Sequence, residues 1–140
     1  MRCALLLVVQ VTAINAPPAN ADSSVERWGL FETSFNQTFP AFAGMETPFT
    51  ATFTQGDTKI VVPGFWDGGT RYAVRFSPPT TGTWEFETTS RSPSLHGRKG
   101  SFIAVEPTAN NHGPIGVFKT HYLRHADGTP YHQFGTTCYA

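Results

Sequence analysis

The stretch that decides the fold is residues 71–88, which read RYAVRFSPPTTGTWEFET. Apolar and polar residues alternate on both sides of the central SPPTTG segment, and alternation with period two is typical of a strand with one buried face. The Pro- and Gly-rich centre is a turn signal, so we predict a β-hairpin with an aromatic inner face. A shift of the pairing by one residue would set Arg75 opposite Trp84, which disfavours the shifted register. The predicted cross-strand pairs are Phe76 with Trp84, Val74 with Phe86, and Arg75 with Glu85.

Other segments carry weaker strand signals. Phe49, Ala51 and Phe53 alternate with threonines and precede a Gly56-Asp57 turn. Residues 28–35, the first predicted strand, have apolar side chains on both faces, which indicates a bulge or a central position in a sheet. Strands at intervals of about ten residues without helical periodicity are typical of a sandwich. We therefore predict an all-β fold, an immunoglobulin/fibronectin-like antiparallel β-sandwich. The additional strand segments are residues 28–35, 49–54, 59–62 and 100–106.

The composition limits the classes of function. The chain has 140 residues, enough for one domain with one core. Charged residues make up 14% of the chain, well below the roughly 25% of typical soluble domains. The formal net charge is zero, so we expect no basic surface that would attract nucleic acid or an anionic membrane. No cofactor is predicted.

The N-terminus has the features of a secretory signal peptide. Arg2 provides a positive charge, residues 4–14 form an apolar stretch, and the ANA sequence at 19–21 is a small-x-small cleavage site. A membrane anchor is the alternative, but a spanning helix needs about 20 apolar residues, and this stretch is shorter. We predict that residues 1–21 are removed and that the protein is secreted or periplasmic, without a membrane attachment after cleavage.

Signal cleavage would leave a single cysteine. Cys3 lies within the predicted signal peptide and Cys138 is the other cysteine of the chain. No internal disulfide can then form, so the sandwich has to rely on its core. Because no ordering partner is visible in the sequence, we interpret Cys138 as a small buried residue rather than a nucleophile.

The sequence pattern changes at Pro107. Residues 116–118 and 122–125 carry a second hairpin signal, and the DGTP sequence at 127–130 is a turn. The last run, residues 131–140, is strand-like and ends without a turn or polar tail, which we interpret as a truncated gene or a fragment. The predicted division is a signal peptide at 1–21, a β-sandwich domain at 22–107, and a linker hairpin with the start of a truncated barrel at 108–140.

Several short motifs follow one another along residues 25–140. They are VERW at 25–28 with FE at 31–32, VPGFWDG at 62–68, YAVRF at 72–76 with Pro79, Gly82 and Trp84, NHGP at 111–114, DGTP at 127–130, and FGTTCY at 134–139. Each motif alone is weakly specific. Their order and spacing together resemble the immunoglobulin-like β-sandwich module, of unassigned function, that precedes the catalytic barrel of secreted apiosidase-like glycoside hydrolases.

The resemblance implies where the chemistry lies. The GTTCY segment at 135–139 would be the first strand of a (β/α)₈ barrel, whose catalytic carboxylates come later, at the C-terminal ends of other strands. The chain as given would then not be an enzyme, whereas its full-length parent would be a glycoside hydrolase. We predict a non-catalytic N-terminal accessory domain of a secreted carbohydrate-active hydrolase, with the catalytic barrel of the same polypeptide as its partner. The sequence departs from the family pattern at residues 44–46.

Two sets of residues have the types used in hydrolysis or metal binding. Glu85 and Glu87 are two apart on one strand face, and glycosidases use two carboxylates about 5–9.5 Å apart. Their predicted place on the outer face, without desolvation, favours a structural role.

A zinc site needs three or four converging ligands, and the histidine-containing segment does not have a helical pattern. We predict no metal site, and histidines packed at a domain junction: His112, His121, His125 and His132.

The candidate for ligand binding is the WDGG sequence at 66–69. Sugar-binding modules stack pyranose rings on exposed aromatic side chains beside a carboxylate or amide. Trp66 and Asp67 could therefore bind carbohydrate, such as a plant or microbial polysaccharide, which makes a carbohydrate-binding module the alternative function. In the structural interpretation, Trp66 covers the core and Asp67 bonds to the amides of its own turn.

Overall fold

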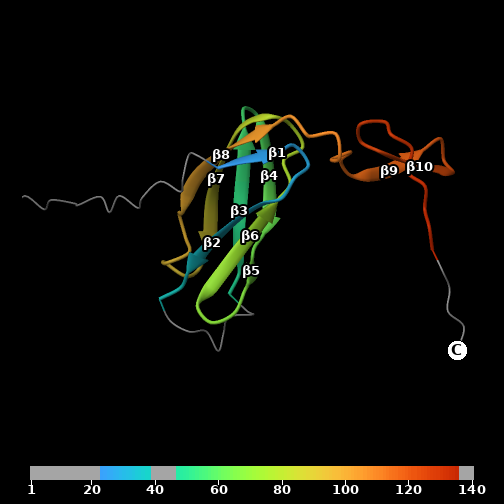
Figure 1. The fold of residues 1–140 in the computed structure, drawn as a ribbon. Coiled ribbons are helices and arrows are strands. Elements are labelled where there is room, and N and C mark those ends of the chain that lie inside the picture. The colour runs from blue at the N-terminus through green and yellow to red at the C-terminus, as the bar shows by residue number, and fades with distance from the viewer. Residues whose placement is uncertain (1–22, 39–46, 136–140) are drawn as a thin grey trace, which may run out of the picture.

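The structure is a computed structural model, which describes residues 23–38 and 47–135. The described residues contain strands and no helix (Figure 1). The strands are β1 (Ser24–Glu26), β2 (Phe31–Asn36), β3 (Phe49–Gln55), β4 (Thr58–Pro63), β5 (Phe65–Trp66), β6 (Arg71–Phe76), β7 (Gly82–Ser90), β8 (Lys99–Val105), β9 (Ile115–Phe118) and β10 (Tyr122–His125). The predicted all-β class is confirmed. The predicted signal peptide and Cys138 lie outside the described residues.

Two sheets form a sandwich-like body. One sheet has the order β1-β8-β7-β3-β4 and the other has the order β2-β6-β5. Neighbouring strands are antiparallel, with the exception of β1, which runs parallel to β8. The strands β3 and β4 are joined at Gly56, which has a φ of 55°. This positive φ is a conformation that glycine adopts without a steric penalty, which confirms the turn predicted there.

The predicted hairpin of residues 71–88 is wrong in its pairing. β6 pairs with β2 and β5, whereas β7 pairs with β3 and β8 in the other sheet. The rings of Phe76 and Trp84 do meet, but across the core, with centroids 5.0 Å apart. The connection contains Pro78 and Pro79, which cannot donate to a ladder, so the chain crosses from one sheet to the other instead of pairing back. Both aromatic faces are then buried between the two sheets.

The predicted pair of Arg75 with Glu85 is wrong for the same reason. Arg75 instead bonds to Glu32 on β2, with Nε 2.6 Å from Oε2. Glu85 lies between Thr54 and Ser101 on the outer face of the other sheet. Glu32 and Glu85 are both acidic and could each pair with Arg75, so charge alone could not decide which of them is the partner.

A double-mutant cycle distinguishes the two pairings. We expect a coupling free energy of about 0.2–1 kcal/mol between Arg75 and Glu32, because they are direct cross-strand neighbours. The Arg75 and Glu85 pair should show coupling near zero, since the two residues belong to different sheets. Urea unfolding of Arg75→Ala, Glu32→Ala, Glu85→Ala and the two double variants measures both terms. Equal coupling in the two cycles would contradict the observed topology.

Aromatic rings from both sheets fill the core. Phe53 of β3 stacks on Phe76 of β6 with a centroid separation of 4.0 Å and an interplanar angle of 9°. Phe31 of β2 stacks on Phe102 of β8, also at 4.0 Å. Each stacked pair joins one sheet to the other, so the aromatic packing holds the two layers face to face.

The opening segment, predicted as one strand over residues 28–35, is two strands in different sheets. β1 ends at Glu26, and β2 begins at Phe31 after a turn. Trp28 occupies this turn with a φ of 66°. The change of sheet explains why apolar residues fall on both faces of the segment: Val25 packs against the core from β1, and Phe31 packs into it from β2.

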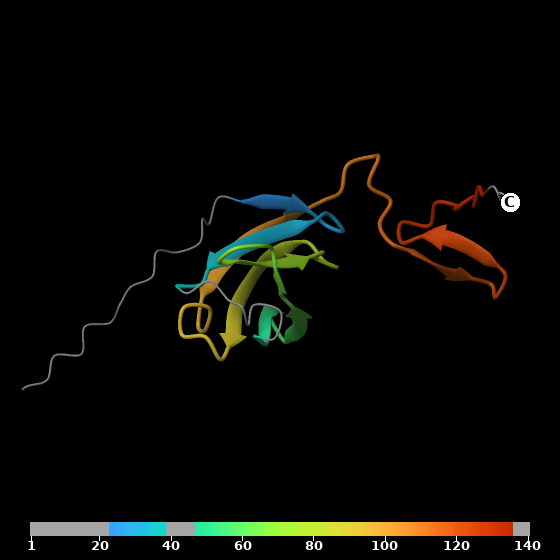
Figure 2. The same ribbon diagram turned by 90° about the horizontal axis from the view of Figure 1, so that it is seen from below.

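The second predicted hairpin is confirmed. β9 and β10 pair antiparallel, with Phe118 opposite Tyr122. They form a separate two-stranded sheet, joined to β8 by a linker (Figures 1 and 2). Residues 131–135 are not in a strand, and residues 136–140 lie outside the described part, so the first barrel strand stays a prediction.

Candidate functional site at the junction of sandwich and hairpin

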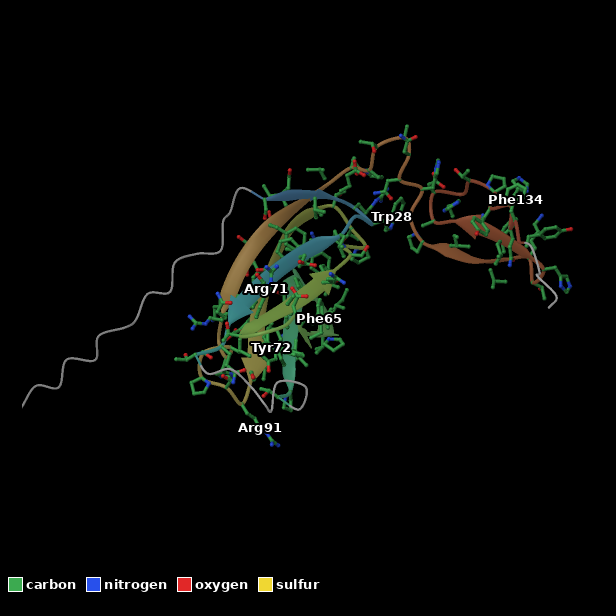
Figure 3. All side chains as sticks on the ribbon, turned by 60° about the horizontal axis from the view of Figure 1, so that its bottom comes forward. Trp28, Phe65, Arg71, Tyr72, Arg91 and Phe134 are labelled. Carbon is green, nitrogen blue, oxygen red and sulfur yellow. The ribbon has the colours of Figure 1, made fainter. Side chains whose placement is uncertain are left out.

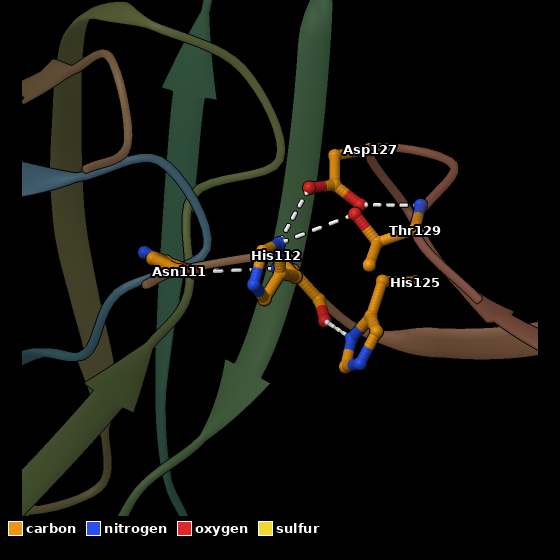
Figure 4. A network of polar contacts seen from close by, with 6 residues as sticks. Asn111, His112, His125, Asp127 and Thr129 are labelled. Atoms are coloured by element: carbon orange, nitrogen blue, oxygen red, sulfur yellow. Dashed lines mark hydrogen bonds and ion pairs between the residues drawn. The ribbon is translucent and has the colours of Figure 1, made fainter. Parts of the chain in front are cut away.

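A polar network joins the sandwich to the β9–β10 hairpin, and we call it the junction cluster. It combines the turn after β1 with the segment before β9 and the turn after β10. Figure 3 shows Trp28 between the two parts, and Figure 4 shows the polar contacts. Its members are Glu26, Arg27, Trp28, Asn111, His112, Gly113, His125, Asp127 and Thr129.

Asn111 connects the linker to the end of β1. Its Nδ2 donates to Glu26 Oε2 at 2.8 Å and to the Arg27 carbonyl at 3.0 Å. Its Oδ1 accepts from the Gly113 amide at 3.3 Å. Hydrogen bonds from Asn111 and from Thr108 lower the pKa of the Glu26 carboxyl below its ordinary value. One amide side chain therefore ties together segments that are 85 residues apart in sequence.

The Trp28 ring leaves no room for a side chain at Gly113. A Cβ on Gly113 would lie 2.5 Å from the Trp28 ring, and Gly113 has a φ of 76°. The Trp28 amide donates to the Pro78 carbonyl at 2.9 Å, which holds the turn against the connection between β6 and β7. The Arg27 guanidinium covers the ring at 4.1 Å from its centroid. Glycine is required at position 113 both for its backbone conformation and for the space.

The turn after β10 is organised by Asp127. Its Oδ1 accepts from the Thr129 amide at 2.9 Å, and its Oδ2 lies 2.7 Å from His112 Nδ1. The bond from the Thr129 amide and then the bond from His112 lower the pKa of Asp127 to about 2. The turn predicted at 127–130 is confirmed, and it is an Asx turn that also holds a histidine from the linker.

The predicted role of the histidines is met in part. His125 Nδ1 donates to the Gly113 carbonyl at 3.0 Å, and its ring lies 5.3 Å from that of His112. These two histidines pack at the junction. His121 is exposed beside the hairpin loop, and His132 is exposed after the turn. Within residues 23–38 and 47–135, no group of three or more metal-ligating side chains gathers.

The low pKa of Asp127 gives the junction a pH dependence with a defined sign. A carboxyl whose pKa falls from 3.8 to about 2 on folding contributes stability above pH 3.8, and that stability is lost as the pH falls toward 2. We expect the Thr129 amide proton shift to titrate with a midpoint near pH 2 in NMR, and Asp127→Asn to abolish this titration. A midpoint close to 3.8 would show that the Asx turn does not hold the carboxylate.

Trp66 and Asp67 lie at the edge of the three-stranded sheet. The register pairs Phe65 with Ala73 and Trp66 with Tyr72, so the successive aromatic side chains leave opposite faces of the sheet. Trp66 is 40% exposed, and its indole Nε1 donates to the Gly69 carbonyl at 3.0 Å. Asp67 Oδ2 lies 3.1 Å from Arg71 Nε. Arg71 in turn lies 3.6 Å from Glu32, so Asp67 belongs to a chain of ion pairs on the outer face.

Glu85 and Glu87 are exposed on the outer face of the five-stranded sheet, as predicted. Glu87 Oε2 lies 3.3 Å from Lys99 Nζ on the neighbouring strand. This exposed ion pair is a common cross-strand contact of a sheet surface and contributes little free energy.

Sequence reasoning missed the residues on the sandwich side of the junction. Glu26, Arg27 and Trp28 meet Asn111 and Gly113 only after the chain has folded through β2–β8. The motifs VERW and NHGP contain all five residues, but no local pattern indicates that the two motifs touch.

A membrane-spanning helix is absent from residues 23–38 and 47–135.

Fold and junction together define a β-sandwich-like module that holds a hairpin at one end. Residues 24–91, the segment from β1 through β7, match the model of a family described as "Domain of unknown function (DUF5060)". None of the curated proteins compared with the chain matches it.

A crystal structure of a "putative glycoside hydrolase" from Bacteroides vulgatus is similar to the chain, with 39% sequence identity and a TM-score of 0.78. The match covers 85% of this chain and 23% of that chain, so the chain spans about a quarter of this relative's length. The unmatched 15% of the chain amounts to fewer residues than the C-terminal part 108–140 contains. The similarity therefore extends beyond the sandwich into the C-terminal part.

Proposed function

We propose that the chain is a non-catalytic accessory module of a longer, secreted glycoside hydrolase. The observation that carries the proposal is the match at 39% identity to about a quarter of the Bacteroides protein. A module of this size accounts for a small part of such a polypeptide, and the proposed catalytic barrel is the remaining part. In this proposal residues 1–21 direct secretion and residues from about 135 onward begin the barrel.

The junction cluster supports this role. Linkers between independent domains are commonly polar, flexible and poor in contacts. Here Asn111 bonds to the sandwich, His112 to the turn after β10, and Gly113 to the end of β10. A bonded linker holds the hairpin in a defined position relative to the sandwich. Such a module would stabilise its neighbour and set the neighbour's orientation.

The proposal is tested by assaying purified residues 22–140 against a panel of aryl glycosides. We expect no hydrolysis above the rate in buffer. Glu85→Gln serves as the control variant, because Glu85 and Glu87 are the carboxylate pair with the spacing that could suggest catalysis. Hydrolysis by unaltered residues 22–140 that Glu85→Gln abolishes would overturn the proposal.

The exposure of Trp66 supports a second candidate function, a carbohydrate-binding module. A ring that is 40% exposed at a sheet edge offers a face for a pyranose. Titration of the chain with xylan and cellulose oligosaccharides, followed by tryptophan fluorescence, tests it. Saturable quenching that is lost in Trp66→Ala would support binding. Quenching that persists in Trp66→Ala, or no quenching with any saccharide, would exclude Trp66 as the binding residue for these glycans.

A further inference from the structure

The β9–β10 hairpin has two chemically different faces. Residues directly opposite in an antiparallel pair share a face. The register sets Leu123 opposite Val117 and His125 opposite Ile115, which places three aliphatic side chains on one face. Val117 is 73% exposed and Ile115 is 46% exposed. We call Ile115, Val117 and Leu123 the aliphatic face.

The opposite face carries aromatic and basic side chains. Phe118 pairs with Tyr122 there, and Gly116 pairs with Arg124. The Arg124 guanidinium lies over the Phe118 ring at 4.1 Å, and Lys119 Nζ lies 5.3 Å from the same ring centroid. Two cations therefore lie over the Phe118 ring, and the adjacent Tyr122 is 65% exposed.

In the described part of the chain the aliphatic face is covered only at its base, where the Tyr131 ring lies 5.5 Å from His125 and Leu123 is half-buried, whereas Ile115 and Val117 are exposed. A two-stranded hairpin is marginally stable in water without a second layer. The junction cluster bonds the base of this hairpin to the linker, through His125 and Gly113, and leaves Val117 exposed to solvent. Beyond β10, Phe134 is 92% exposed and adds a further large apolar side chain (Figure 3). Exposed apolar groups that gather on one element mark an interaction surface.

We propose that the aliphatic face docks onto an apolar surface of the rest of the polypeptide in the longer protein. This inference rests on the proposed accessory function and names the surface that it uses. More than three quarters of the Bacteroides chain lies outside the match, and the match reaches into the part of this chain that contains the hairpin. In this proposal the contact is intramolecular, and the bonded linker presents the hairpin to its neighbour. A saccharide does not suit this face, because aliphatic side chains offer neither hydrogen bonds nor an aromatic plane.

Hydrogen exchange in a chimera tests the docking. Residues 22–140 replace the matched segment of the Bacteroides protein, and exchange of the amides of 115–125 is compared with that in residues 22–140 alone. We expect exchange at least about ten-fold slower in the chimera, because a docked hairpin opens less often. Val117→Lys should remove this protection. Tyr122→Lys is the matched control, since Tyr122 is 65% exposed on the opposite face of the same hairpin, and it should keep the protection.

Three results would overturn the inference: equal exchange in chimera and isolated chain, equal effects of the two lysine variants, or a stoichiometric dimer of residues 22–140 in light scattering that Val117→Lys dissociates. The last result would make a second copy the occupant of the face. If the chimera does not fold, exchange is measured after mixing residues 22–140 with the separately purified remainder of the Bacteroides protein, with the same expectations. Failure of docking leaves the hydrolysis assay unchanged, so the two proposals are tested separately.

Discussion

Replacing Trp84 with alanine is expected to destabilise the sandwich by about 3–5 kcal/mol, the range for removing a large aromatic side chain from a core. Trp84 is fully buried, its ring packs against Phe76 of the other sheet, and its indole Nε1 donates to the Thr80 carbonyl at 3.0 Å. The substitution removes contacts to both layers and leaves a cavity between them. Because domains are stable by only about 5–15 kcal/mol, a large share of the variant is expected to be unfolded near physiological temperature.

Urea unfolding followed by circular dichroism measures the effect of Trp84→Ala. Trp66→Ala is the matched control, because it removes the same side chain from a position that is 40% exposed at a sheet edge. The midpoint of the control should change by a small fraction of the change in Trp84→Ala. Similar midpoints for the two variants would mean that Trp84 does not join the sheets.

The Gly113→Ala variant should release the hairpin from the sandwich. A Cβ at this position would lie 2.5 Å from the Trp28 ring, and the φ of 76° disfavours any side chain. A left-handed conformation costs a residue with a Cβ about 1–2 kcal/mol, and forcing atoms into a packed contact costs about 1–3 kcal/mol more. The sandwich core does not include Gly113, so the loss should be confined to the junction.

Two readouts separate local release from unfolding in Gly113→Ala. The emission of Trp28 should shift to longer wavelength as its ring becomes hydrated, while the urea midpoint of the sandwich changes little. Gly128→Ala is the control, since Gly128 has a φ of 94° but nothing within 4 Å of a Cβ. The control carries the backbone strain without the clash. If both variants shift the emission equally, the contact with Trp28 does not hold the junction.

The strands that were predicted well are those whose signals are local. The alternation in residues 49–54 and the turn at Gly56 predict β3, β4 and the turn between them, because these signals lie within a few residues of one another. The β9–β10 hairpin and the Asp127 turn follow from equally short spacings. In each case the hydrogen-bond partners are close in sequence, so side-chain periodicity and turn chemistry suffice.

The candidate ligand-binding residues Trp66 and Asp67 show a limit of prediction from side-chain periodicity. The sequence places Trp66 and Asp67 side by side and suggests one site. The strand β5 turns the Trp66 side chain to the face of Tyr72, whereas Asp67 joins Arg71 in an ion pair. A two-residue strand at a sheet edge leaves almost no pattern in the sequence, so this division could not be predicted.

The amino-acid sequence by itself determined the all-β class, the inner aromatic face of each long strand, and the positions of the tight turns, since these depend on contacts between near neighbours. The tertiary structure alone decided which strands pair. The alternating faces of β6 and β7 suit a hairpin as well as two facing sheets, and burial of both faces at once favours the sheets. The tertiary structure also decided which residues form the junction cluster, because Glu26 and Asn111 are 85 residues apart and meet only when the whole sandwich has formed between them.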